Sequence, residues 1–352
     1  MTQILVLNLG STSSKIAIYQ DNECLFEECI VHDMFLLSQP LAQQAPLRQK
    51  CIEQTLEQHQ IYLTAINAIA CRGGLLKPIV GGTYAVNDKM YTDLENGRYG
   101  LHASNLSGMI GYQLGKLYKI PVYTTDPVVI DELIDEVRYT GLPDVSRKSI
   151  FHALNHKAVA RCYAKNSHKN YEDVNVIVAH MGGGISIAAH RQGRVIDVNE
   201  ALYGEGPMAL TRAGSIPNDL LLQFAQDSNY TVTDMKDYLT RQSGIKAYTG
   251  TTDFKALMNQ YNTDSTIKQL IDALAIQIAK AIGERAALLK GQVDQIIFTG
   301  GISYNQQFIS LIQDYIEWIA PITIYAGEYE MTTLAEQAYL AYHQQISINT
   351  YR

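Results

Sequence analysis

Two stretches of this chain repeat one pattern, and this repeat constrains the fold more than any other feature. The first is QILVLNLGSTSSKIAIYQDNECLFEE (3–28) and the second is VNVIVAHMGGGISIAAHRQGRVIDVN (174–199). Each is predicted to form a strand, a turn of small residues, a second strand, a hairpin turn and a third strand. Two such openings predict a duplicated domain. Because hairpins are common, a chance likeness is the alternative.

The remaining chain alternates between helical and strand patterns. Strands are predicted at 120–127, at the start of 293–319 and at 322–326, and a helix should start near Ser303 after the turn that follows the second of these. Other helices are predicted at 41–61, 104–118, 152–165, 217–226, 264–290 and 331–344. This alternation is typical of the α/β class. Pro127, Gly141 and Pro143 predict a domain boundary within 127–148.

Composition excludes several classes of protein. The net charge of -7 and the lack of a Lys/Arg run argue against nucleic-acid binding. Five cysteines without a CxxC pair favour a reduced, cytoplasmic compartment over disulfides or a zinc site. The N-terminal apolar run stops at Asn8 without a basic segment before it, so no signal peptide is expected. No apolar run is long enough to predict a membrane span.

Three glycine-containing turns follow predicted strands, at 10–14, 182–184 and 300–301. Backbone N–H groups in such turns form anion-binding nests, and glycine allows a phosphate to approach closely. The helix after Gly300 and Gly301 would add its positive N-terminal end. Each turn alone is a weak signal, but together they predict a polyphosphate held between two domains. A Walker A motif and a GxGxxG fingerprint are both absent.

Six motifs in order along the chain resemble the acetate and butyrate kinase family of the actin-like ATPase superfamily. They are NLGSTSSK (8–15), CRGG (71–74), FHALNHK (151–157), HMGGGISIAA (180–189), MALTRAG (208–214) and FTGGISYN (298–305). The chain is shorter than typical acetate kinases and is similar to the butyrate branch. The resemblance implies reversible phosphoryl transfer from ATP to butanoate, with Mg²⁺, giving butanoyl phosphate and ADP.

The resemblance also implies an architecture. It consists of two duplicated actin-like (ribonuclease H-like) domains with a nucleotide cleft between them. The first domain would comprise 1–127 with a returning C-terminal helix in 329–352. The second, 128–328, would bind nucleotide and carry the contact of a homodimer or higher homo-oligomer, to which the helix at 264–290 is a candidate contributor. A place for that helix in the core is the alternative.

The chemistry of a carboxylate kinase explains which residues its site needs. A short fatty acid has a carboxyl pKa near that of Glu, about 4.3, so it is ionised at pH 7 and needs no general base. The obstacle is repulsion between this anion and the γ-phosphate, which cations, hydrogen-bond donors and positioning must overcome.

The family's site residues carry over to matching positions. Arg72, Asp126, His152 and Arg212 are the implied catalytic residues. Arg72, Gly73, Gly74 and Phe151 would bind the carboxylate. The nucleotide would contact Asn8, Gly10, Ser11, Ser13, Lys15, His180, Gly182, Gly183, Gly184, Gly300 and Gly301. The metal would be directed by Asn8, Asp126 and one of Glu328 and Glu330, of which Glu328 is preferred.

Two departures from acetate kinases concern glycines. Gly183 replaces an Asn that touches phosphate, so only backbone contacts would remain there. Gly73 and Gly74 replace a Val-Val pair of the acyl pocket, and the missing side chains are expected to make room for a C4 acid. One methylene changes discrimination by only about 1–3 kcal/mol, so acetate, propionate and branched acids stay alternatives.

Two further functions stay open. One is another enzyme of the same fold: a sugar kinase with Asp126 as base, or a carbamoyl-adenylate transferase with a metal on His152 and His156, which are spaced i, i+4. The other is a non-catalytic or mechanical actin-like ATPase. The Arg72, His152 and Arg212 set favours the carboxylate kinase.

Overall fold

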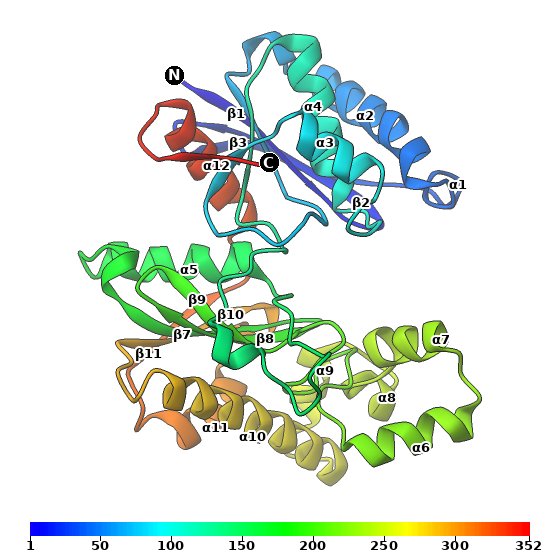
Figure 1. Cartoon of the computed structure of the whole chain (residues 1–352), viewed down its shortest axis with the longest axis vertical. Helices are drawn as coiled ribbons and strands as arrows, with labels where there is room; N and C mark the ends of the chain where they lie inside the picture. Colours follow the sequence, from blue (N-terminus) through cyan, green and yellow to red (C-terminus); the bar gives the residue numbers. More distant parts are fainter. The chain divides into compact units, whose positions relative to one another are not determined.

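The computed structural model describes residues 1–352 and divides into two compact units (Figure 1). The first unit comprises Met1–Asp131 and Tyr329–Arg352, and the second comprises Glu132–Glu328. The division falls after Asp131 because Ile130 forms a bridge with Ile79 and the Asp131 N–H donates to the Ile79 carbonyl, which keeps 128–131 with the first unit. None of the helices has the length and hydrophobicity that a membrane crossing needs.

The first unit is built on a seven-stranded sheet with the order β12-β5-β6-β4-β1-β2-β3. Strands β1, β2 and β3 form consecutive antiparallel hairpins, while β4 and β6 continue the sheet parallel to β1. The strands are β1 Gln3–Leu9, β2 Ser13–Gln20, β3 Glu23–Val31, β4 Ala68–Cys71, β5 Thr83–Ala85, β6 Val122–Thr125 and β12 Ile348–Thr350. The alternating pattern of KIAIY (15–19) places Ile16 and Ile18 in the core.

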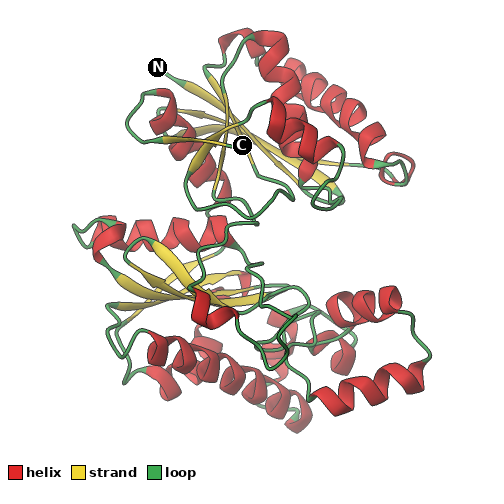
Figure 2. Ribbon diagram, in the orientation of Figure 1, coloured by secondary structure: helices red, strands yellow, loops and turns green.

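Helices lie on both sides of this sheet (Figure 2). They are α1 Met34–Leu37, α2 Leu41–Gln58, α3 Asp88–Glu95, α4 Asn105–Tyr118 and α12 Glu330–Tyr342. Helix α12 packs on β1, β4 and β6, and α4 packs on β1 and β4. Gly111 and Gly115 allow α4 to approach closely, since a Cβ at Gly115 would lie 2.8 Å from the Ile120 carbonyl oxygen.

The second unit is built on a five-stranded sheet with the order β11-β10-β7-β8-β9. Its strands are β7 Asn175–Met181, β8 Ile185–Arg191, β9 Arg194–Val198, β10 Gln295–Gly300 and β11 Ile322–Ala326. Its helices are α5 Ala153–Asn166, α6 Asn218–Ser228, α7 Val232–Asp237, α8 Ile245–Thr249, α9 Phe254–Gln260, α10 Ser265–Leu288 and α11 Gln306–Ile316. Helix α5 packs on β7 and β10, while α10 packs on β7, β8 and α11.

The two sheets share one topology. The order β3-β2-β1-β4-β6 of the first corresponds to β9-β8-β7-β10-β11 of the second, with the same strand directions. Even the register shift of the outer hairpin recurs, between Ile18 and Tyr19 and between Ala189 and His190. The predicted duplicated α/β fold is therefore confirmed.

Two details differ from the sequence-based expectation. The helix predicted near Ser303 is preceded by a 3₁₀ turn, Gly301–Tyr304, and α11 begins only at Gln306, where the Asn305 side chain caps the Phe308 N–H. The apolar side of α10 packs in the core of the second unit through Leu274, Ile278 and Ile282. This core placement is the alternative to an oligomer contact.

Candidate active site

Three predicted site residues lie at the carboxyl ends of parallel strands in the first unit. Asn8 is the penultimate residue of β1, Arg72 directly follows β4, and Asp126 directly follows β6. These strands are neighbours in the order β6-β4-β1, so their ends lie along one sheet edge. In α/β sheets this edge is where ligands bind.

Asn8, Arg72 and Glu330 form a contact that we call the first-unit triad. The Asn8 side-chain amide donates to Glu330 Oε2 at 2.9 Å. Arg72 Nη1 donates to Asn8 Oδ1 at 3.2 Å and lies 3.4 Å from Glu330 Oε2. Glu330 is the first residue of α12 and only 7% exposed, and the positive end of the helix dipole favours its carboxylate there.

This arrangement favours Glu330 over Glu328 as the glutamate of the site. Glu328 is exposed and ends the second unit, whereas Glu330 begins the helix that packs on β1 and β4. The start of α12 decides which carboxylate meets Asn8 and Arg72, and it favours Glu330.

Asp126 is fully buried and has a left-handed backbone, with φ 43°. Its Oδ1 accepts from the Gly82 N–H at 2.7 Å, and its own N–H donates to the Gly82 carbonyl at 3.1 Å. A left-handed, buried aspartate at a strand end is the kind of strained position that clusters at functional sites.

The turn after β1 is held from beneath by Arg48, a residue that the motif analysis missed. Arg48 of α2 is fully buried and donates to the carbonyl oxygens of Gly10 (2.8 Å), Ser11 (3.0 Å) and Ser13 (3.3 Å). Burial lowers the pKa of Arg48. Lys15, predicted to contact nucleotide, lies 2.9 Å from Glu27 in an ion pair on the hairpin. Arg48 therefore fixes the path of the turn.

The structure gives a different reason for glycine at positions 73 and 74 from the one predicted. A Cβ at Gly73 would overlap Pro127 and lie 3.1 Å from Thr124 Oγ1. A Cβ at Gly74 would lie 2.6 Å from the Asn105 Cα. The space beside both glycines is thus filled by neighbouring backbone and side chains, and it offers no additional room for an acyl chain. The pocket-size argument drawn from them is wrong.

In the second unit, Arg212 lies against the glycine turn between β7 and β8. A Cβ at Gly184 would overlap the Arg212 guanidinium, so only glycine leaves room for it. Arg212 Nη1 donates to the Ala201 carbonyl, and Thr211 Oγ1 donates to the Gly183 carbonyl at 3.2 Å. Burial lowers the pKa of Arg212, while the Glu200 carboxylate opposes this shift.

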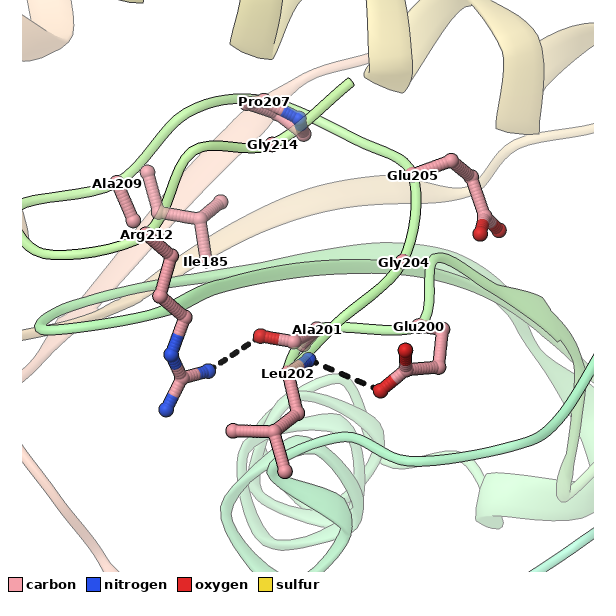
Figure 3. A pocket seen from close by; sticks show the side chains of 10 residues that line it. All are labelled: Ile185, Glu200, Ala201, Leu202, Gly204, Glu205, Pro207, Ala209, Arg212 and Gly214. Carbon is pink, nitrogen blue, oxygen red and sulfur yellow. Dashed lines mark hydrogen bonds between the residues drawn. The ribbon is translucent and has the colours of Figure 1, made fainter. Parts of the chain in front are cut away.

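Glu200 is a second residue that the motifs did not reveal. Its carboxylate accepts from the Leu202 and Tyr203 N–H groups, at 3.1 and 3.0 Å, and burial raises its pKa. It thereby orders the segment that receives the Arg212 guanidinium (Figure 3).

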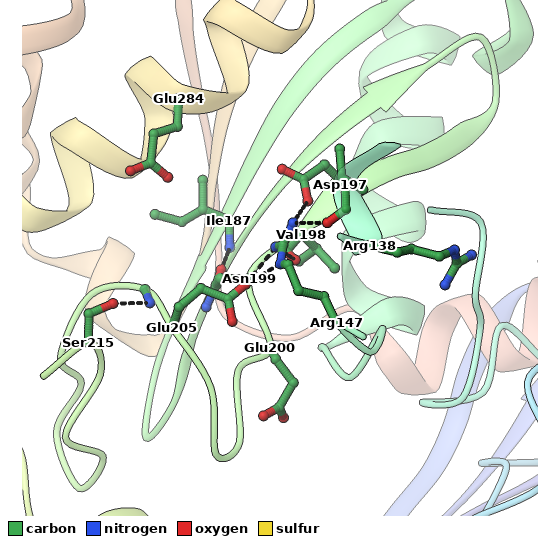
Figure 4. Close-up of polar contacts among 12 residues, drawn as sticks. Arg138, Arg147, Ile187, Asp197, Val198, Asn199, Glu200, Glu205, Ser215 and Glu284 are labelled. Atoms are coloured by element: carbon green, nitrogen blue, oxygen red, sulfur yellow. Dashed lines mark hydrogen bonds and ion pairs between the residues drawn. The ribbon is translucent and has the colours of Figure 1, made fainter. Parts of the chain in front are cut away.

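The loop carrying Arg212 is tied to the sheet by a polar network (Figure 4). Arg147 binds Asp197 at 2.9 Å and Glu205 at 2.5 Å and donates to the Val198 carbonyl at 2.9 Å. Asn199 accepts from the Ile187 N–H at 2.7 Å. These bonds join β8, β9 and the following loop, so they limit the movement of Arg212.

The histidines of the second unit come together at the start of α5 and the end of β7. The His152 and His180 rings stack with centroids 3.9 Å apart. Asn155, fully buried on α5, donates to His180 Nδ1 at 2.9 Å and to Thr299 Oγ1 at 3.0 Å. Phe151 is buried and packs edge-on against His156, with centroids 5.2 Å apart. Asn155 therefore links His180 to β10.

The third glycine turn lies at the end of β10. Gly300 has φ 86°, and a Cβ there would overlap the Met181 carbonyl. Gly300 also exchanges two backbone hydrogen bonds with Gly327, at 3.0 and 3.1 Å. In contrast, a Cβ at Gly183 or Gly301 would meet nothing within 4 Å. Gly300 is required by the packing of β7 on β10, whereas the other two positions have space for a ligand.

No group of three or more His, Cys, Asp or Glu side chains is arranged to hold a metal by itself. His152 Nδ1 and His156 Nε2 each lie 2.8 Å from the hydroxyl of Ser186, so these two nitrogens are already engaged.

Comparison with known proteins agrees with the fold and the motifs. The model of the acetokinase family matches residues 143–336. Butyrate kinase 1 of Clostridium acetobutylicum is 44% identical over 339 residues, 96% of each chain. A probable butyrate kinase of Clostridium botulinum is 43% identical over 339 residues, again 96% of each.

Solved structures show the same fold at low identity. Acetate kinase from Porphyromonas gingivalis has a TM-score of 0.79 at 18% identity, covering 96% of this chain and 99% of that one. A propionate kinase from Francisella tularensis has a TM-score of 0.77 at 19% identity, with 96% and 99% covered. The predicted actin-like fold is confirmed by these matches.

Proposed function

This chain belongs to the acetokinase family, and we propose that it transfers the γ-phosphoryl group of ATP to the carboxylate of butanoate. The products are butanoyl phosphate and ADP, and the reaction is reversible. The observation that carries this proposal is the 44% identity to a butyrate kinase over 96% of both chains. Acetate, propionate and branched short-chain acids are the alternative acceptors within the family.

The first-unit triad supports this chemistry. Arg72 presents a cation at the carboxyl end of β4, where it is 37% exposed and held by Asn8 and Glu330. A guanidinium binds a carboxylate or a phosphoryl group through paired N–H donors. Arg72 binds the acid and reduces its repulsion from the γ-phosphate.

The second unit supports the proposed reaction because it holds hydrogen-bond donors for the transferring phosphoryl group. Arg212 is held against the turn at Gly184 by its bond to Ala201. His152 stands at the start of α5 with its Nδ1 bound to Ser186. Phosphoryl transfer depends on such positioned charges and donors more than on covalent chemistry by the protein.

The residues present fit Mg²⁺, the metal that such a kinase uses. Glu330 and Asn8 offer oxygen ligands at the sheet edge, and Asp126 stands at the same edge. Mg²⁺ takes few protein ligands beside phosphates and water, so a complete protein cage is not needed. When bound, the ion would neutralise phosphate charge; Asn8, Asp126 and Glu330 would direct it.

The test is product formation with Mg-ATP and acetate, propionate, butanoate, isobutanoate or no acid, with acyl phosphate trapped by hydroxylamine. Hydroxamate that depends on the acid, and is greatest for a C4 acid, supports the proposal. Preference for acetate would contradict the assignment of butanoate within the family. ATP binding without acid-dependent product would support a non-catalytic actin-like ATPase.

A matched pair of variants ties this activity to the site. Arg72→Gln should lower kcat/KM for butanoate by about 100-fold, because it removes a cation aimed at developing charge. Arg98→Gln, an exposed arginine of the same unit, should have little effect. Equal losses in both variants would contradict the role of Arg72.

We propose further that the enzyme acts in the cytoplasm as a homodimer or higher oligomer that associates through the second unit. Exposed apolar side chains on α6 and α7, namely Leu220, Leu222 and Val232, support such a contact. Light scattering of the purified protein tests it. A monomer at micromolar concentration, unchanged by Leu222→Glu, would contradict it.

A further inference from the structure

A row of hydrogen-bonded side chains runs through the second unit from His152 to Tyr171. His152 Nδ1 and His156 Nε2 each lie 2.8 Å from Ser186 Oγ. His156 Nδ1 lies 3.4 Å from His190 Nε2, and His190 Nδ1 lies 2.7 Å from the Tyr171 hydroxyl. We call these five residues the imidazole chain. The three middle members, Ser186, His156 and His190, are fully buried.

Hydrogen counting links the direction of every bond in the imidazole chain. A neutral imidazole has one N–H donor and one acceptor nitrogen, and a hydroxyl has one hydrogen. Burial, followed by the neighbouring His190 and His180 rings, holds the pKa of His156 well below the ordinary value, and burial with Lys157 and Arg161 does the same for the pKa of His190, so both rings are neutral. With neutral rings, the three bonds from Tyr171 to Ser186 must point the same way along the chain, and a single direction along all four bonds gives every donor hydrogen an acceptor. A bond at the Tyr171 end therefore fixes which nitrogens of His190 and His156 carry hydrogen, and it leaves the Ser186 hydrogen available to His152.

Tyr171 sets this direction. A phenol O–H is a better donor than a neutral imidazole N–H, and the imidazole nitrogen is a better acceptor than the phenol oxygen, as their proton affinities require. Lys157 Nζ and Arg161 Cζ lie over the Tyr171 ring, 5.7 and 5.9 Å from its centroid, and they strengthen the hydroxyl as a donor. Lys157 is itself paired with Glu132 at 2.8 Å.

The donor and the acceptor of each bond are then assigned in turn, starting from Tyr171. Tyr171 donates to His190 Nδ1, His190 Nε2–H donates to His156 Nδ1, and His156 Nε2–H donates to Ser186 Oγ. Ser186 keeps its own hydrogen, and we take His152 Nδ1, 2.8 Å from Ser186 Oγ, as its acceptor. His152 is left with its hydrogen on Nε2.

We propose that Ser186, His156, His190 and Tyr171 are positioning residues that hold His152 in the Nε2–H tautomer. Under the proposed function, on which the catalytic meaning of this inference rests, His152 donates a hydrogen bond to the transferring phosphoryl group. A ring locked as an Nε2–H donor needs no reorganisation during the reaction, which is how preorganised donors lower a barrier.

The neighbouring His180 is fixed in the same tautomer by a separate contact. Asn155 donates to His180 Nδ1, so His180 carries its hydrogen on Nε2. That nitrogen lies 3.5 Å from the position that a Cβ of Gly182 would occupy, beside the glycine turn. Two rings stacked at 3.9 Å would repel strongly if both were charged, so neutral rings with defined tautomers suit this geometry.

The test reads the tautomer directly, in the full chain labelled with ¹⁵N-histidine. Long-range ¹H–¹⁵N correlation spectra identify which ring nitrogen carries hydrogen. The wild type should show hydrogen on Nε2 and not on Nδ1 for His152, His156 and His190. Hydrogen on Nδ1 of His152 would overturn the proposal. Because this readout needs no turnover, it stands even if butanoate is not the substrate.

Tyr171→Phe removes the donor that sets the direction but keeps the ring. A signal for Nδ1–H on His152 should appear, and kcat should fall about three- to tenfold, the range of one hydrogen bond, with KM for both substrates unchanged. Tyr163→Phe, on α5 but outside the imidazole chain, should change neither. Wild-type spectra and wild-type kcat in Tyr171→Phe would overturn the proposal.

Ser186→Ala breaks the chain next to His152. The kcat should fall about 10- to 100-fold, which is the range for losing the hydrogen bond from His152 to the charged phosphoryl group. Adding Tyr171→Phe to Ser186→Ala should lower kcat no further. Additive losses in the double variant would show that Tyr171 acts by another route and would overturn the inference.

Discussion

Replacing Gly184 by alanine should displace the Arg212 guanidinium and leave the second unit folded. The new Cβ would overlap Arg212 Nη1 and Cζ and would lie 3.0 Å from Nε. The clashing atoms are the far end of a long side chain, so the guanidinium can move without a change in the backbone.

The size of the effect follows from this displacement. Ordinary contact between heavy atoms needs about 3.5–4.0 Å, so the guanidinium must retreat by on the order of 1 Å. The bond from Arg212 to the Ala201 carbonyl is then lost. A misplacement of about 1 Å at a catalytic group can cost about 100-fold, or about 2.7 kcal/mol of activation free energy. Unfolding stability should change by less than about 1 kcal/mol.

The assay is steady-state hydroxamate formation with Mg-ATP and butanoate, together with thermal unfolding. A glycine of α10 provides the control, because a Cβ at Gly283 would meet nothing within 4 Å and Gly283 has no place in the site. Gly184→Ala should lose kcat while Gly283→Ala keeps it. Wild-type kcat in Gly184→Ala, or equal losses in both variants, would refute the assignment of Arg212 to the transferring phosphoryl group.

Glu330→Gln should lower kcat about 10- to 100-fold because the first-unit triad loses a charged hydrogen bond, and kinetics should show a smaller loss for Glu328→Gln. The reverse order would contradict the choice of Glu330. Gly74→Ala should destabilise the fold by about 1–3 kcal/mol, measured by urea unfolding, because its Cβ would crowd α4; unchanged stability would contradict the close approach. His156 and His190 have lowered pKa values in the fold and take up protons on unfolding, so stability should fall as pH drops below about 6.5, by at most about 1.4 kcal/mol per pH unit for each ring. Urea unfolding between about pH 7.5 and 5.5 measures this, and an unchanged slope in His190→Gln would contradict it.

The strands that carry the site were predictable from local sequence. Alternation in 15–19 and 185–189, beside turns of small residues, places both hairpins correctly in their sheets. The short strands β5 and β12 were not predictable, because each has three residues and exists through its pairing. Their partner strands are distant in sequence, so local propensity does not identify them.

Site residues were predictable from the sequence where a motif contains them. They were not predictable where tertiary packing determines which side chains meet. Asn8 and Arg72 stand in motifs, but their contact with Glu330 depends on where α12 begins. Arg48 supports the β1–β2 turn from a helix 38 residues beyond Gly10, and nothing in the turn's own sequence indicates it. The sequence suggested that Gly73 makes room for the acyl chain, because only the fold shows that Pro127 fills the space beside it.

The most direct test of the central claim is a ³¹P NMR spectrum of the purified protein with Mg-ATP and butanoate. The account predicts a new acyl phosphate resonance that grows with ADP, depends on butanoate and disappears on addition of hydroxylamine. Release of inorganic phosphate alone, at a rate independent of the acid, would contradict it, because the γ-phosphoryl group would then pass to water and not to a carboxylate.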